Sequence, residues 1–426
     1  MKENQQNEND PSCCCKEKRG LSKETQAIHV AYRKRDAYDA LSVPVYNSVA
    51  FEFDNAHAMT EAFTGRSGMP DYSRTANPTV TNLEDRVQAL TEAYSVTAFN
   101  SGMAAIGNTL LALAGSGKNV VTSHHLFGNT FSLLTSTLKR FGVETRLVDL
   151  TDIKAVAEAI DENTACVYFE IITNPQMEVI DIKELSQVAH SKGTVVVADT
   201  TTIPFTQFSS RNLGVDIEVL SSTKYISGGA TSLGGLVIDY GTAKQFTETI
   251  KGELLFNLGA YMTPQVAYLQ TIGLETLSAR YRVQSGNALE LAKRLQQLPQ
   301  IKRVNYVGLE DNPYHELAKK QFGATAGAMV CIDLENVEAC YNFINNLQLI
   351  HRATNLFDNR SLAIHPYSTI FGNFTPQQKK EMDVFDTTIR LSIGLEDVED
   401  IYNDIAQSIA SLNEKYAHTY GVLNDK

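Results

Sequence analysis

The chain is poor in positive charge and in long apolar runs, and each shortage excludes a class of protein. Its 426 residues include 37 lysines and arginines against 49 aspartates and glutamates, which gives a formal net charge of −12. Surfaces that bind nucleic acid or anionic membranes need the opposite balance, so we expect neither partner. No apolar run reaches the roughly 18 residues that a membrane helix requires.

Cysteine is also too scarce for a disulfide scaffold, with six residues in all. Cys166, Cys331 and Cys340 lie in apolar runs, and the adjacent Cys13–Cys15 cannot easily pair with one another. The first twenty residues are polar and lack the apolar core of a secretory signal. We therefore expect a reducing, cytoplasmic setting and a disordered tail over residues 1 to about 25. The cysteine triplet could bind metal, be acylated or carry sulfur, but reactive thiols in a polar tail are the simplest interpretation.

Short β-rich runs alternate with helical patterns between residues 76 and 273. The predicted strands are SVTAFN, KNVVTS, VETRLVDL, TACVYFEII, TVVVADT, IEVLSST and SLGGLVIDY. Helical segments separate several of them, for example at 151–160 and 181–192, and a helix begins near Asn77. This alternation predicts an α/β fold with a mostly parallel sheet covered by helices on both faces.

The sequence predicts three parts. Residues 1–75 form a tail and an irregular arm, residues 76–273 the α/β domain, and residues 274–426 a smaller α+β domain. The third part is predicted from the long helical pattern LSARYRVQSGNALELAKRLQQL, the strands GAMVCIDL and IRLSIGLED, and a helix near 336–347. We find no internal repeat in the chain.

Polar residues follow several predicted strands, where open α/β sheets bind their ligands. Ser101, Gly102 and Met103 come between a strand and a helix, and the free N–H groups of such a helix start form a phosphate seat. Asp199 ends the strand TVVVA, and it could cap a helix, bind a metal or pair with a cation. Lys224 follows the next strand, so both side chains are expected at one edge of the sheet.

A lysine at the end of a buried strand is costly as a charge but useful as an amine. A lowered pKa makes such an amine a good imine former and proton carrier. With a phosphate seat, and with Asp199 to hold a pyridine nitrogen, Lys224 indicates a site for pyridoxal 5′-phosphate (PLP). Ser221 and Thr223 could hydrogen-bond the phosphate. The alternative for Lys224 alone is an ordinary surface lysine.

Two other motifs are rejected. SSTK matches an S-x-x-K pattern that would make Ser221 a nucleophile, but no K-T-G element accompanies it, and here the pattern ends a strand instead of opening a helix. GSGKN at 115–119 resembles a P-loop, but Ala112 replaces its first glycine and Asn119 its Ser or Thr. It also lies between a helix and a strand, the reverse of the P-loop order.

Seven motifs in order resemble the PLP-dependent enzymes of Cys/Met metabolism. They are YSRTANPT, NSGMAAI, the NP of EIITNPQMEVIDI, VADTT, SSTKYISGG, HPYST and RLSIGLED. The resemblance covers about residue 25 to the C-terminus and implies PLP fold type I, with an aspartate aminotransferase-like large domain. The family includes O-acetylhomoserine sulfhydrylase, cystathionine γ-synthase, the cystathionine lyases and methionine γ-lyase. TQAIHV and SVPVYNSVAFEFDNA are most similar to the sulfhydrylase branch.

The resemblance also implies a role for each site residue. Lys224 would hold PLP as a Schiff base and move protons, and Asp199 would hold the ring nitrogen. Arg390 would grip the substrate carboxylate, and Asn174 would lie near the ring oxygen, with the substrate-binding residues. The implied phosphate ligands are Ser101, Gly102, Met103, Ser221 and Thr223, with Tyr72 and Arg74 from a neighbouring subunit. A homodimer that shares active sites is therefore expected, and a tetramer beyond it, with no metal.

The chain departs from the family in several places. FGNT puts Phe127 where members usually have a tyrosine that stacks on the ring, and HPYS carries Tyr367 where many members read HPAS. We hypothesise that Tyr367 supplies the phenol that Phe127 lacks. In ATNLFDNRSL, Asn355 occupies the position of a serine at the substrate carboxylate, and Phe357 stands where members have glycine. The apolar GELLFNLGAYMTP is suited to exclude large polar substrates.

The predicted activity is γ-replacement on an O-acylated homoserine by a free or carried sulfur donor, which gives homocysteine for methionine biosynthesis. The missing phenol argues mildly against a vigorous eliminating lyase. Methionine γ-lyase and cystathionine γ-synthase or lyase remain alternatives, and the remote one is a catalytically silent PLP-binding paralogue. The sequence leaves open the acyl group and the sulfur donor.

Overall fold

The structure, a computed structural model, describes most of the chain: residues 20–30, 36 and 38–421. The disorder predicted for the tail lies outside the described residues as far as position 19, and so does Cys13–Cys15. The prediction of disordered and irregular chain is wrong for residues 23–29, which form helix α1 (Lys23–His29). The Ser22 hydroxyl caps this helix by accepting a hydrogen bond from the Thr25 N–H, a short signal within a polar sequence.

Seven strands form the main sheet, in the order β1-β7-β6-β5-β4-β2-β3. They are Ser95–Phe99 (β1), Asn119–Thr122 (β2), Glu144–Leu147 (β3), Thr164–Glu170 (β4), Val195–Asp199 (β5), Ile217–Leu220 (β6) and Gly235–Asp239 (β7). β2 to β6 pair in parallel, whereas β7 runs antiparallel to both β1 and β6. The predicted mostly parallel sheet is confirmed, and each strand lies within a run predicted from the sequence.

Alternate residues of the central strands enter two cores, one on each face of the sheet. On β5, Val196 and Ala198 belong to one hydrophobic cluster, and Val197 belongs to the other. The first core is covered by α3 (Pro78–Thr91), α6 (Ile153–Ala159), α7 (Ile182–Ser191) and α9 (Pro264–Glu275). The second is covered by α4 (Gly102–Leu113), α5 (Gly128–Ser132) with its π and 3-10 continuations (Leu133–Thr137, Leu138–Phe141), and the π turn Glu248–Leu255. Helices therefore cover both faces, as predicted.

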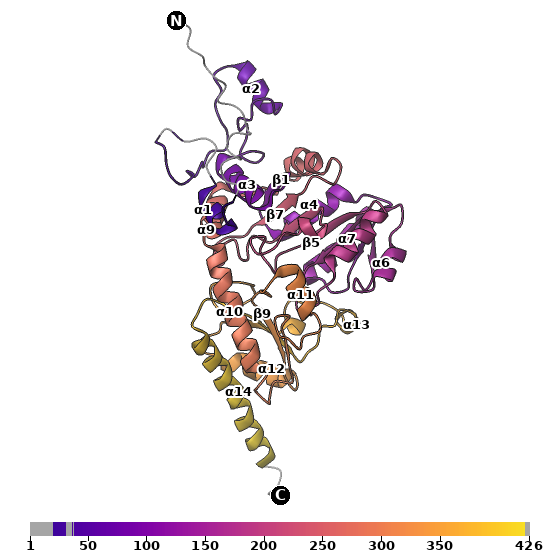
Figure 1. Cartoon of the computed structure of the whole chain (residues 1–426), viewed down its shortest axis with the longest axis vertical. Coiled ribbons are helices and arrows are strands. Elements are labelled where there is room, and N and C mark those ends of the chain that lie inside the picture. Colours follow the sequence, from indigo (N-terminus) through magenta and orange to yellow (C-terminus); the bar gives the residue numbers. More distant parts are fainter. Residues whose placement is uncertain (1–19, 31–35, 37, 422–426) are drawn as a thin grey trace.

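A smaller antiparallel sheet follows, in the order β10-β11-β9-β8. Its strands are Arg303–Asn305 (β8), Met329–Asp333 (β9), Leu362–Ile364 (β10) and Thr388–Ser392 (β11). Its helices are α10 (Leu277–Leu295), α11 (His315–Phe322), α12 (Val337–Asn346), α13 (Pro376–Glu381) and α14 (Val398–Gly421), of which α10 and α14 pack together (Figure 1). No helix among the described residues is both long and apolar enough to cross a bilayer.

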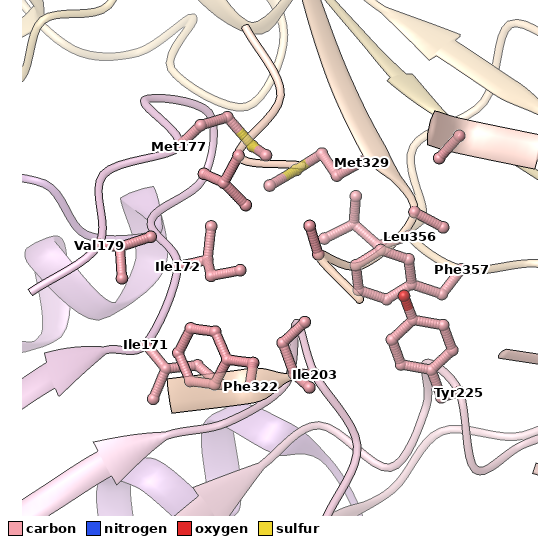
Figure 2. Packing of buried hydrophobic residues seen from close by; sticks show 14 of the residues in the cluster. Ile171, Ile172, Met177, Val179, Ile203, Tyr225, Phe322, Met329, Leu356 and Phe357 are labelled. Carbon is pink, nitrogen blue, oxygen red and sulfur yellow. The ribbon is translucent and has the colours of Figure 1, made fainter. Parts of the chain in front are cut away.

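One hydrophobic core joins the two sheets. Figure 2 shows Ile172 and Met177, which follow β4, in the same buried cluster as Met329 on β9 and Leu356 before β10. The domain boundary predicted near residue 274 falls at the end of α9, and the apolar cluster is continuous across it. Because the core is continuous, the two sheets hold each other in place, and a ligand site can form between them.

An N-terminal arm projects from the body of the molecule (Figure 1). It contains α2 (Ala56–Phe63), capped by the Asn55 side chain, where the sequence predicts irregular chain. The large apolar side chains exposed between residues 38 and 72 are Tyr38, Leu41, Val45, Val49, Met59, Phe63, Met69 and Tyr72. Exposed apolar surface of this kind is typical of an interaction site.

The cysteines of the described residues are all free and buried: Cys166, Cys331 and Cys340. Burial raises the pKa of each thiol to about 12. These side chains therefore behave as small apolar core residues that stay protonated near neutral pH.

Candidate active site

The carboxyl ends of β1, β4, β5 and β6 meet at a cavity of about 270 Å³ between the two sheets. The predicted residues that line it are Ser101, Gly102, Met103, Phe127, Asn174, Asp199, Ser221, Thr223, Lys224, Asn355 and Arg390. Segments far apart in the sequence thus converge on one place. The predicted residues that do not line it are Tyr72, Arg74 and Tyr367.

The start of α4 forms an anion seat in this cavity. The Ser101 hydroxyl caps the helix by accepting a hydrogen bond from the Ala104 N–H at 3.1 Å. Gly102 lies so close to the next segment that a Cβ atom on it would be 2.7 Å from the Ser221 Cβ. Only glycine fits there, and its place leaves the positive end of the helix available to a phosphate.

Thr223 lines the cavity, but its hydroxyl is engaged within its own loop. It donates to the carbonyl of Gly234 at 3.1 Å and accepts from the Gly234 N–H at 2.9 Å. The backbone N–H of Ser221 donates to the Thr201 hydroxyl at 2.9 Å. These bonds hold the segment after β6 in place, and they make the Ser221 hydroxyl a better-placed phosphate donor than Thr223.

Two carboxyl groups, Asp199 and Glu170, line the cavity from register partners on β5 and β4. Burial raises the pKa of both, that of Glu170 to about 8, and the charge of Asp199 adds to the rise at Glu170. Asp199 accepts hydrogen bonds from the Thr201 N–H at 2.9 Å and the Tyr168 hydroxyl at 3.4 Å. Glu170 accepts one from the Phe127 N–H at 2.5 Å. Such a pair fits a ligand with a protonated nitrogen.

Lys224 lies in the turn that follows β6, and its amine contacts the loop before β10 of the smaller sheet. The Nζ atom donates to the side-chain oxygen of Asn355 at 2.6 Å. Burial lowers the pKa of this amine to about 8, and the positive charge of Arg390 adds to the effect. The amine is therefore neutral far more often at pH 7 than that of an exposed lysine, as a nucleophile requires.

Arg390 on β11 is a buried cation with its hydrogen bonds incomplete. One terminal nitrogen donates to Asn174 Oδ1 at 3.1 Å and the other to the backbone carbonyl of Asn355 at 3.0 Å. The Nε atom is buried without a hydrogen-bond partner, and no carboxylate of the described residues forms a salt bridge with it. Burial lowers the pKa of this guanidinium to about 10. A ligand carboxylate would supply the missing charge and acceptor.

Phe127 and Tyr367 have different places in the structure. Phe127 lines the cavity at the start of α5. Tyr367 is not among the cavity residues; its ring packs in the core on the α4 side, with the Lys379 ammonium 3.9 Å from its centroid. The hypothesis that its phenol serves the site therefore has no support in the geometry. A one-residue difference within the HPYS motif does not predict the direction of the ring, because that direction depends on the packing around it.

Tyr72 and Arg74 lie at the root of the arm, outside the cavity of their own chain. The Arg74 guanidinium donates to the carbonyl of Phe256 and lies over the rings of Tyr72 and Phe256, 5.4 and 5.2 Å from their centroids. Tyr72 is 40% exposed. The structure therefore does not bring these two residues to the other predicted phosphate ligands within one chain.

Sequence reasoning missed Glu170, Thr201 and Leu233, which also line the cavity. Glu170 ends a predicted strand at the same edge as Asp199, so the rule that pointed to Asp199 applies to it as well. Leu233 is 66% exposed although it belongs to the cavity wall. No local pattern marks it, because its place depends on the turn between β6 and β7.

The donor set fits PLP. A glycine-lined helix start suits the phosphate, a buried carboxyl pair the ring nitrogen, and an amine of lowered pKa the aldehyde. Residues 24–410 match the family described as "Cys/Met metabolism PLP-dependent enzyme". The chain belongs to this family. It is thus a PLP-dependent enzyme of the α/β fold that the sequence predicts.

The similar proteins are named for elimination or for sulfur transfer. An L-methionine gamma-lyase of Fusobacterium nucleatum subsp. polymorphum is 37% identical over 392 residues, which are 91% of this chain and 98% of the relative. A Campylobacter jejuni structure described as an O-acetylhomoserine (thiol)-lyase has a TM-score of 0.88 at 33% identity, covers 92% of this chain and 100% of its own, and carries N′-pyridoxyl-lysine-5′-monophosphate. An O-acetylhomoserine sulfhydrylase structure from Wolinella succinogenes is 42% identical, with a TM-score of 0.71 over 79% of this chain and 99% of its own.

Proposed function

We propose that the protein replaces the γ-substituent of an O-acylhomoserine with sulfur from a donor and so produces homocysteine. One observation carries the proposal: Asn355 joins a reactive amine, Lys224, to the buried guanidinium of Arg390, which has no counter-ion in the described part of the chain. An α-amino acid has a carboxylate that complements the guanidinium and, on the neighbouring carbon, an amine of the same reactivity toward an aldehyde as the amine of Lys224. Arg390 would bind the carboxylate, and the site beside Lys224 would receive the amine end of the substrate.

Lys224 is the proton carrier of the proposed reaction. Bound PLP supplies an electron sink, which allows the substrate to lose protons at Cα and Cβ and then its γ-substituent. Lys224, with a pKa of about 8, is both an acid and a base near neutral pH, and it can serve both carbons. Asp199 would stabilise positive charge on the ring nitrogen, and the closely packed Gly102 and Ser221 would hold the phosphate. Phe127 contributes an apolar ring without a competing hydroxyl.

The charges in the cavity favour an acetyl group as the leaving group. Among the described residues, the ionisable side chains that line it are Glu170, Asp199, Lys224 and Arg390, and each has a role above. Much of the remaining wall is apolar: Met103, Ile106, Ile172, Leu233, Leu356 and Ile370. A succinyl or phosphoryl group, or the distal end of cystathionine, would place a charge against this wall without a partner. We therefore favour O-acetylhomoserine as the substrate.

Elimination from methionine is the second candidate. The same apolar wall fits a methylthio group, and an L-methionine gamma-lyase is among the relatives. A silent PLP-binding protein is the remote candidate.

A product assay separates these functions. PLP-loaded protein is offered O-acetylhomoserine, O-succinylhomoserine or L-methionine, each with and without sulfide, and homocysteine, 2-oxobutyrate and methanethiol are measured. We expect homocysteine as the main product, formed from O-acetylhomoserine and sulfide. Dominant 2-oxobutyrate in the presence of sulfide would overturn the proposal in favour of a lyase. PLP binding without any turnover would identify the silent protein.

We further infer that the active unit is at least a dimer, with a tetramer as its doubled form. Tyr72 and Arg74 lie outside the cavity, beside an arm whose apolar side chains are exposed. A second copy of the chain that packs on this arm would cover the apolar surface. The same contact would carry the Tyr72 hydroxyl and the Arg74 guanidinium toward the phosphate seat of its neighbour.

A further inference from the structure

The turn after β6 and the loop before β10 lie beside each other and are joined at successive points. At the first point, the Lys224 amine donates to Asn355. At the second, the ring of Tyr225 stacks on that of Phe357, with centroids 4.0 Å apart and planes 5° apart (Figure 2). Tyr225 directly follows Lys224 in the chain, and Phe357 directly follows Leu356. Both of these preceding residues line the active-site cavity.

A third contact fixes the far end of this pair of segments. The Asn359 amide donates to the carbonyl of Gly228 at 3.3 Å. A Cβ atom on Gly229 would lie only 2.6 Å from the same amide, so the Asn359 side chain packs directly against the glycine backbone. The carbonyl of Asp358 accepts a further bond from Gln284 on α10 at 2.7 Å. The loop before β10 is thus held on both sides of Phe357.

Phe357 has a backbone conformation that its residue type rarely adopts. Its φ is +58°, in the left-handed region that favours glycine, and its side chain is fully buried. Its N–H donates to the Ser392 hydroxyl at 2.7 Å, and Ser392 lies on β11 two residues after Arg390. Glycine would adopt this φ without strain, but it would lose the ring. The strained position is maintained because the stack over-determines it.

We propose that the stack of Tyr225 and Phe357 is a positioning element for substrate binding. It holds Asn355 so that the side-chain oxygen meets Lys224 at 2.6 Å while the backbone oxygen meets Arg390 at 3.0 Å. Asn355 thereby sets the spacing between Lys224, beside which the substrate amine would lie, and Arg390, which would bind the substrate carboxylate. Phe357 touches neither the cofactor site nor the reacting atoms, so it acts only through Asn355 and Leu356.

A double-mutant cycle tests this inference. Phe357→Met and Tyr225→Met each remove one ring but keep an adaptable apolar side chain, and the double variant removes both. Because a displacement near 1 Å can cost about a hundredfold in rate, we expect each single variant to raise the KM of the amino-acid substrate roughly tenfold or more. The double variant should be no worse than the worse single one. Tyr225→Phe keeps the stack and should keep the KM.

Two measurements distinguish positioning from a general loss of packing. Phe343→Met alters an equally buried phenylalanine on α12 and serves as the control, with KM expected near that of the unmodified protein. Amide hydrogen exchange at residues 354–357 of the PLP-loaded protein should become faster in the Phe357 and Tyr225 variants but not in the control. The visible absorbance of bound PLP checks cofactor content in each.

The outcome is independent of which amino acid the enzyme uses, because the KM is measured with the substrate that the product assay identifies. If Phe357→Met changes KM and exchange no more than Phe343→Met does, the stack has no positioning role. Losses that multiply in the double variant would also overturn the proposal, since the two rings would then act separately. If Phe357→Met fails to fold, Tyr225→Met still tests the same stack from its other side.

Discussion

At the scale of single residues, the active site is defined by charges that the fold leaves uncompensated. Lys224 and Arg390 are two cationic side chains that line one buried cavity, and burial lowers the pKa of each. Glu170 and Asp199 are two acids in contact with the same space. An amino acid and a phosphorylated pyridine ring complement all four. The free protein therefore carries an electrostatic cost that its ligands remove.

The cost at Lys224 predicts a pH-dependent stability in the cofactor-free protein. The amine has a pKa of about 8 when folded and an ordinary value of 10.5 when unfolded. Between these values the unfolded chain binds the proton that the folded chain releases, so stability rises with pH. Below pH 8 the folded protein bears the whole cost, on the order of 3 kcal/mol. Lys224→Met should thus be the more stable protein at pH 7, with an advantage that shrinks toward pH 10.5.

Urea unfolding of both cofactor-free proteins between pH 7 and 10.5 checks this prediction. A stability difference that does not change with pH would contradict it, because packing alone would then explain the variant. Lys224→Met in the presence of PLP should also show no turnover, which confirms that the altered residue is the catalytic lysine.

Arg390→Lys tests carboxylate binding. A lysine keeps the charge but loses the planar pair of donors, so we expect the KM of the amino-acid substrate to rise roughly 10- to 100-fold with a smaller change in kcat. Steady-state kinetics with O-acetylhomoserine and with L-methionine provide the measurement. An unchanged KM for both would show that the carboxylate binds elsewhere.

At the scale of elements, strand register determines which side chains meet. β4 and β5 are parallel and in register from Cys166 opposite Val195 to Glu170 opposite Asp199, so their last residues carry the two acids of the site side by side. The segment between β6 and β7, residues 221–234, then carries Lys224 to the same edge. A shift of one residue on either strand would turn its acid to the opposite face of the sheet.

The pairing of the two acids gives a second pH prediction. Glu170 has a pKa of about 8 when folded and an ordinary value of 4.5, so between these values the folded protein keeps a proton that the unfolded chain loses. Stability of the cofactor-free protein must therefore fall as pH rises through this window. Glu170→Gln should match the unmodified protein near pH 5 and exceed it in urea resistance near pH 8. The exposed Glu162→Gln is the control, and equal pH profiles for all three proteins would refute the prediction.

The sequence predicts regular elements well and their relations less well. Every strand of the main sheet lies in a predicted run, because each is a short β-rich stretch bounded by polar residues, and all but the edge strand β3 are largely buried. β8 and β10 have three residues each and leave no periodic pattern. The site residues at strand ends were predicted from strand order alone. Phe357 and Tyr367 show the limit, because the direction of each ring depends on partners distant in the chain.

At the scale of the whole molecule, the cavity lies between two sheets, but part of the predicted site belongs to the arm. The arm extends from the body, with α2 at its outer part (Figure 1). Tyr72 and Arg74 at its base cannot complete the phosphate seat of their own chain without moving from Phe256. The assembly of copies is thus expected to be part of the catalytic design, not an addition to it.

Complementation between inactive variants tests that assembly. In a mixed dimer of Lys224→Ala and Arg74→Ala chains, one site has both changes and the other has neither. Random mixing after dissociation should therefore restore about a quarter of the unmodified activity. Each variant alone, taken through the same procedure, is the control. A mixture no more active than its parents would show that Arg74 serves its own chain or no site at all.

The burial of Cys166, Cys331 and Cys340 has a consequence for a protein proposed to handle sulfur. Solutions of sulfide and thiols contain polysulfides and disulfides, which pass sulfur to any accessible thiolate. These three side chains are inaccessible and, with pKa values near 12, remain thiols. None of these three cysteines would therefore divert sulfur from the substrate carbon in the reaction that we propose.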